Sequence, residues 1–246
     1  MRALLFLAAA ALAAPAIAQS PSAPAAAPVN EISPEALELA KLVEPAGEST
    51  TLALNAAKTG FFQVLKGSPD SAAMEAEYPG IYQAVWEAME PLMRETLTAD
   101  TPKLWTKLAR LYTQRLTPSE IAGLRRFYST PVGQKMIRAM SQQADLAPII
   151  ESASKSTNYT VSAEAFDKTR ASGIEAAVDT ITPADHAALE DLAQSIPLPK
   201  LTALGPDVQR ITLAWMNEPD PDLDARIEKV VEERMIRFMA EADKKK

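Results

Sequence analysis

One short segment combines basic, aromatic and glycine residues at a predicted helix start, and that combination could bind an anion. Free backbone amides at a helix N-terminus attract phosphate and carboxylate groups, and nearby arginines supply countercharge. The segment contains Arg125, Arg126, Phe127, Tyr128, Pro131, Gly133, Gln134 and Lys135. The same residues also suit a plain helix elbow, in which aromatics end one helix and a glycine permits close backbone approach.

Positive charge is concentrated around that segment. Residues 103–138 contain eight basic residues and one acid, Glu120, in a chain whose net charge is −7. A basic surface of this kind attracts acidic proteins or anionic envelope components, whereas internal pairing with the acidic remainder of the chain would neutralise it. We expect internal pairing for much of the segment. The candidate binding residues are Arg110, Arg125, Arg126, Tyr128, Gly133, Gln134 and Lys135.

Signals for catalysis or metal binding are weak. Asp220, Asp222 and Asp224 alternate as in a calcium loop, but Ala225 replaces the glycine that such a loop requires at its turn. The single histidine, His186, has no nucleophile or second ligand beside it. A hydrolase built on two carboxylates remains an alternative, with Glu87 and Glu90 beside Trp86 as its first candidates. We therefore predict no catalytic residues, no metal site and no cofactor.

Composition limits the remaining classes. The chain has 246 residues, 47% hydrophobic and 23% charged, with no cysteine, and its isoelectric point is near 5.0. The apolar fraction indicates a globular fold, and the missing cysteines exclude disulfides and thiol chemistry. An acidic chain is a poor partner for nucleic acid.

Prolines punctuate the chain in a way that is typical of helix starts. Ser, Thr or Asp precedes proline and a helically periodic apolar run, as expected for an N-cap followed by the first helical residue. These starts are Ser33-Pro34, Thr101-Pro102, Thr117-Pro118, Thr130-Pro131, Thr182-Pro183 and Asp220-Pro221. Strand signals are almost absent, so the prediction is an all-α multi-helix bundle.

Two of these starts belong to segments that resemble each other at a spacing of 65 to 66 residues. Thr117-Pro118 and Thr182-Pro183 each begin a short run that ends near a Ser or Thr and a further proline. This similarity predicts two related helical-hairpin units joined in one compact body, an N-terminal unit over residues 31–157 and a C-terminal unit over residues 158–242.

The N-terminus is typical of a secretory signal. Met1-Arg2 is followed by the apolar run Ala3–Ala14 and by Ala16-Ile17-Ala18, an A-x-A cleavage pattern. The apolar run is shorter than the ~20 residues of a membrane-spanning helix. We expect a signal peptide over residues 1–18, a Pro/Ala-rich linker over residues 19–30, and a mature periplasmic chain without a transmembrane segment.

The first of the two similar segments resembles a known family. Tyr112, Leu116-Thr117-Pro118-Ser119-Glu120, Leu124 and the run from Phe127 to Lys135 are similar to the exported bacterial family catalogued as domain of unknown function 2059. The resemblance covers roughly residues 84–147. It implies an α-helical, signal-bearing protein of the Gram-negative periplasm and supplies no reaction.

Aromatic residues leave one further possibility open. Phe61, Phe62, Tyr82, Trp86, Trp105 and Trp215 are typical of a core, but an incompletely filled helical interior can hold an apolar guest. Our leading hypothesis is a non-catalytic binding or interaction module. The alternatives are a peripheral membrane or lipid-handling protein and the carboxylate hydrolase, and the oligomeric state stays open.

Overall fold

The computed structural model describes residues 31–156 and 158–244, and in these residues the chain is all-α, without strands. Eleven α-helices and one short 3₁₀ helix form the described part, which confirms the predicted fold class. Their bounds are α1 (Pro34–Val43), α2 (Ala46–Lys66), α3 (Pro69–Glu77), α4 (Ile81–Arg115), α5 (Pro118–Tyr128), α6 (Pro131–Gln143), α7 (Ala147–Lys155), α8 (Ala163–Asp179), η3 (Pro183–Asp185), α9 (His186–Ser195), α10 (Leu198–Met216) and α11 (Pro221–Asp243).

Most of the predicted helix starts are confirmed. Ser33, Thr117, Thr130 and Asp220 each accept a backbone N–H of the following helix with a side-chain oxygen. Proline follows each of these residues at the start of the helix. An N–H at that position has no intrahelical acceptor, so its absence in proline costs no hydrogen bond. Capping boxes form at Thr117 with Glu120 and at Thr182 with Asp185.

The start predicted at Thr101-Pro102 is wrong, because α4 runs through it without a break for 35 residues. The Thr101 hydroxyl donates back to the Leu97 carbonyl instead of capping a new helix. A proline inside a helix costs one hydrogen bond. Packing of α4 against α1, α2, α10 and α11 on its sides offsets that loss.

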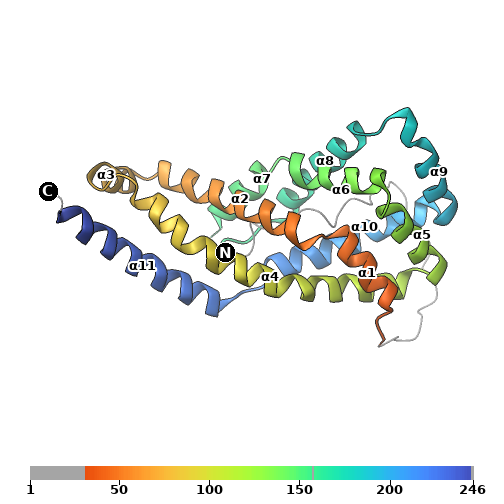
Figure 1. Ribbon diagram of the computed structural model, residues 1–246, viewed down its shortest axis with the longest axis horizontal. Coiled ribbons are helices and arrows are strands. Elements are labelled where there is room, and N and C mark those ends of the chain that lie inside the picture. The colour runs from red at the N-terminus through yellow and green to blue at the C-terminus, as the bar shows by residue number, and fades with distance from the viewer. Residues whose placement is uncertain (1–30, 157, 245–246) are drawn as a thin grey trace.

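Helix α4 runs along most of the length of the molecule (Figure 1). One continuous apolar core contains residues of α4 and of nearly every helix around it. Helix α3 and the C-terminal end of α11 lie at one end of the long axis, and α9 lies at the other. Within residues 31–156 and 158–244, no helix has the length and apolar character needed to span a bilayer. The predicted signal peptide and linker lie outside the described residues.

Candidate binding site

A half-open apolar pocket of about 270 Å³ lies between α2, α4 and α7. The pocket walls are Ala57, Gly60, Phe61, Leu65, Trp86, Met89, Met93, Ile150, Ala153 and Ser154. At roughly 30 Å³ per non-hydrogen atom, this volume holds about nine such atoms. Small residues therefore leave space between the helices, and larger apolar residues surround that space.

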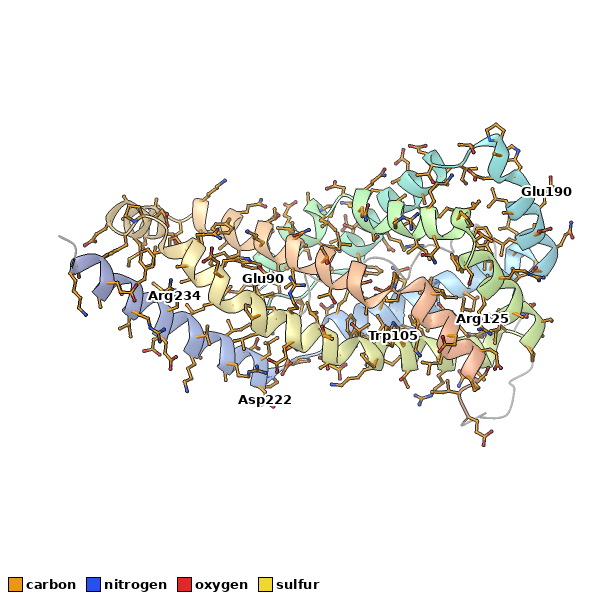
Figure 2. All side chains as sticks on the ribbon, in the orientation of Figure 1. Glu90, Trp105, Arg125, Glu190, Asp222 and Arg234 are labelled. Atoms are coloured by element: carbon orange, nitrogen blue, oxygen red, sulfur yellow. The ribbon has the colours of Figure 1, made fainter. Side chains whose placement is uncertain are left out.

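Aromatic contacts and a hydrogen bond fix the wall formed by Trp86. The Phe61 and Trp86 rings have centroids 5.9 Å apart, and Phe61 also meets Phe62 edge-on at 5.2 Å. Trp86 Nε1 donates to Glu90 at 3.2 Å, and Glu90 in turn pairs with Arg94 at 2.6 Å. Figure 2 labels Glu90 on α4. Because the indole N–H is satisfied, Trp86 presents only apolar atoms to the pocket.

Two exposed side chains mark the mouth of the pocket. Val64 is 50% exposed and Tyr159 is 49% exposed, although both are large and apolar. Tyr159 also has a φ of 53°, in the left-handed region that side chains other than glycine rarely adopt. Such strain persists only where the surroundings hold it, and it is common at ligand sites. The mouth thus combines strained backbone with exposed apolar surface.

The candidate binding residues of the elbow between α5 and α6 point mainly into the protein. Tyr128 is buried, the Gly133 amide donates to Thr130 Oγ1 at 3.1 Å, and the Gln134 side chain donates to the Tyr128 carbonyl at 2.6 Å. A Cβ atom on Gly133 would lie 2.7 Å from the Tyr128 Cα. Gly133 is therefore required for the close approach of α5 and α6. The predicted anion-binding role stays a prediction.

The basic segment divides into paired and unpaired residues. Lys103, Lys107, Arg115 and Lys135 form ion pairs with Asp100, Glu218, Asp207 and Asp185, respectively. Arg110, Arg126 and Arg138 are exposed, and no acidic partner lies within ion-pair distance of them in the described part of the chain. The exposed arginines thus belong to a surface whose lysines are largely neutralised.

Arg125 differs from these residues because it lies beside α1 (Figure 2). Hydrogen bonds from Ser33 and Lys41 are the main causes that lower the pKa of Glu35 and Glu38, and Arg125 adds a weaker attraction to both carboxylates. Its charge is thus directed towards acids of the same molecule.

The carboxylates considered for hydrolysis are engaged in local contacts. Gln83 donates to Glu87 at 2.8 Å. The hydrogen bond from Arg94 is the main cause that lowers the pKa of Glu90, which opposes a role as a general acid. His186 is exposed at the start of α9. The described residues contain no group of three or more acidic or histidine side chains able to hold a metal ion.

Sequence reasoning missed a buried polar cluster at the joint between α1 and α2. Glu44 is fully buried, and in the described part of the chain its two carboxylate oxygens, the Ser49 hydroxyl and the Tyr112 hydroxyl have no hydrogen-bond partner. Trp105 Nε1 donates to the Glu44 carbonyl at 2.8 Å. Burial raises the pKa of Glu44 to about 7, and a weak interaction with the nearby Ser49 hydroxyl, outside hydrogen-bond geometry, opposes part of that shift. The local sequence Glu44-Pro45 carries no signal of this burial.

Comparison with known proteins reaches one part of the chain. Residues 102–153 match the family model DUF2059, an uncharacterized protein conserved in bacteria. The match confirms the resemblance seen in the sequence and extends from Pro102 in α4 into α7. This DUF2059 segment contributes Ile150 and Ala153 to the pocket, and the other wall residues lie outside it. No curated protein and no solved structure matches the chain.

Proposed function

We propose that this protein is a non-catalytic binding module of the periplasm, which takes up an uncharged apolar group in the pocket between α2, α4 and α7. The observation that carries the proposal is the pocket itself, with a Trp86 wall and an exposed apolar mouth. Concave apolar sites between the helices of a bundle are common ligand sites.

The chemistry of the walls defines the ligand. The Ser154 hydroxyl donates to the Glu151 carbonyl, and the other side chains of the walls are apolar. A charged group would therefore lose its hydration without gaining a charged partner. Met89 and Met93 have flexible, polarisable side chains that adapt to ligands of irregular shape. An acyl chain of about nine non-hydrogen atoms fits this description in size and polarity.

Export is part of the proposal, and the sequence of residues 1–18 supports it. A short basic start, an apolar run and an A-x-A pattern are the three parts of a secretory signal. Expression of the full chain in a Gram-negative host should give a periplasmic product. Its intact mass should correspond to a chain that begins at Gln19. A product that keeps residues 1–18 and stays in the cytoplasm would contradict export.

Two related helical units are also part of the proposal. The capping boxes at Thr117 and Thr182 support it. Thr117 precedes α5, and Thr182 precedes η3 and α9. The next helix in each case, α6 or α10, has proline in its first turn. Both units would belong to one body with a shared core, in which the N-terminal unit forms the pocket walls and the C-terminal unit contributes Tyr159 at the mouth.

Calorimetric titration of the folded protein with 1-octanol, an uncharged chain of matching size, tests the binding site. We expect saturable binding that Ala153→Phe abolishes, because the added ring fills the pocket. Glu151→Phe adds the same ring to α7 outside the pocket and should leave binding unchanged. Ala57→Met fills the pocket from α2 and provides a second blocked variant. Equal binding by the blocked variants, or no binding by the wild type, would contradict the proposal.

A free small molecule and a membrane lipid can supply the same acyl chain. Flotation with vesicles of phosphatidylethanolamine and phosphatidylglycerol distinguishes these sources. Co-flotation that Ala153→Phe abolishes identifies a membrane lipid as the source. If the wild type binds 1-octanol but stays with the soluble fraction, the ligand is a free molecule.

A further inference from the structure

Helices α5 and α9 touch at a point where only small residues fit. A Cβ atom on Gly123 would lie 2.9 Å from Ser195 Oγ and closer still to Ser195 Cβ. The side chains beside this contact enclose only about 50 Å³. The two capped helices that resemble each other in sequence are therefore in direct contact with each other.

Two ion pairs flank this contact in a reciprocal pattern. Lys200, at the start of α10, pairs with Glu120 of α5 at 2.5 Å, and Lys135, at the start of α6, pairs with Asp185 before α9 at 2.6 Å. Each lysine lies fifteen residues after the acid of its own segment but binds the acid of the other segment. Glu120 and Asp185 also hold equivalent places, because each accepts the backbone N–H of its capping threonine.

The residues around the small gap between α5 and α9 repeat the same spacing. Eight residues line it, and they form four pairs separated by 65 positions. The pairs are Gly123 with Ala188, Arg126 with Asp191, Phe127 with Leu192, and Thr130 with Ser195. A gap lined by equivalent residues of two segments is the expected result when a twofold axis passes through it.

Packing of the neighbouring helices follows the same pattern. Helix α6 packs against α8, and α10 packs against α4. On the 65-residue spacing, α10 corresponds to α6 and α8 corresponds to the C-terminal half of α4. The C-terminal half of α4 with α5 and α6 is thus one three-helix segment, and α8, α9 and α10 form the other. Each segment places its last helix against the first helix of the other segment.

We infer that the protein is an intramolecular pseudo-dimer, in which the C-terminal half of α4 with α5 and α6 pairs with α8, α9 and α10 about a twofold axis between α5 and α9. The face of the DUF2059 segment formed by α5 and α6 is then a self-pairing surface, and its partner is a second copy of the same unit. In this chain the second copy occupies that surface within one molecule. The inference does not depend on the apolar pocket.

Double-mutant cycles test which lysine forms an ion pair with which acid. Glu120→Gln and Asp185→Asn keep an oxygen for the cap while removing the charge, and Lys135→Met and Lys200→Met remove the partner. We expect each single change to lower Tm by about 2–4 °C. Combining Glu120→Gln with Lys200→Met should lower Tm no further than the larger single effect. Combining Glu120→Gln with Lys135→Met should give additive losses, and the opposite pattern would overturn the reciprocal pairing.

Cross-linking tests the twofold axis, because the axis requires Ala188 to face Thr130 as Gly123 faces Ser195. The chain has no native cysteine, so the double variant T130C/A188C carries only the designed pair. Mild oxidation should close a disulfide within the monomer. The matched control S129C/A187C moves each cysteine by one residue onto an exposed position and should stay reduced. Failure of the first pair to cross-link, or cross-linking between chains only, would overturn the inference.

Discussion

Two helix junctions in this protein are built in opposite ways. Between α5 and α9, Gly123 and Ser195 are in direct contact and ion pairs flank the contact. Between α2, α4 and α7, small residues occur as well, but the helices stay apart and a pocket of about 270 Å³ remains. The first junction uses small residues to close a contact, whereas the second uses them to leave space. The α5–α9 contact is therefore a structural junction, and the space between α2, α4 and α7 is the candidate ligand site.

The acidic residues also differ between two regions, because those at the closed junction are paired and the buried Glu44 is not. Glu120 and Asp185 at the closed junction each have a lysine partner and a backbone N–H donor. Glu44, at the joint between α1 and α2, is buried with no hydrogen-bond partner for its carboxylate among the described residues. The two regions should therefore respond to pH with opposite signs.

The largest effect should come from Glu44. Because burial raises its pKa from 4.5 to about 7, the folded state binds this proton more tightly than the unfolded state. The resulting stability is complete below pH 4.5 and is lost as pH rises through 7. We expect the wild type to lose roughly 3 kcal/mol of unfolding free energy over this interval. Urea unfolding from pH 4.5 to 8 measures this loss, and Glu44→Gln should remove most of it. An equal slope in the variant would show that another group is responsible.

Small-to-large substitutions should have the second-largest effect, and their unfolding free energies should distinguish the two junctions. Gly123→Ala forces the α5–α9 contact apart and should cost about 2 kcal/mol. Ala57→Met adds more volume but places it in the open pocket, so the unfolding free energy should stay within about 1 kcal/mol of the wild type. Urea unfolding at one pH compares the two variants. Similar losses in both would contradict the contrast between a closed and an open junction.

The smallest effect should come from Asp185. The hydrogen bond from Lys135, followed by the Thr182 amide, lowers the pKa of Asp185 from 3.8 to about 2. Its stabilising contribution is therefore present above pH 3.8 and is lost as pH falls towards 2. Thermal unfolding between pH 2 and 5 should show a weaker acid dependence in Asp185→Asn than in the wild type. Asp222→Asn, at an exposed aspartate of α11, serves as the control for the removal of one carboxylate.

Local sequence signals predicted the local structure well. Caps such as Thr117 and Thr130 act within three residues, so their hydrogen bonds follow from the sequence alone. The Thr101-Pro102 signal failed because neighbouring helices hold α4 together across the proline. Local chemistry could not reveal that surrounding packing.

The candidate site was only partly accessible to the same reasoning. Phe61 and Trp86 suggested a possible apolar site, but Ala153 and Tyr159 approach them from a distant part of the chain. The burial of Glu44 depends on contacts with α2 and α4, which a helix-ending Glu-Pro pair does not indicate. The basic segment gave the positions of the lysines and left their acidic partners open.

Methyl NMR of the methionines tests the central claim most directly. Met89 and Met93 line the open pocket, whereas Met140 and Met216 are equally buried elsewhere. On addition of 1-octanol, we predict saturable shifts of the Met89 and Met93 methyl signals with little change at Met140 and Met216. Shifts spread evenly over the buried methionines, or no shift at Met89 and Met93, would contradict the claim that the open junction is the ligand site.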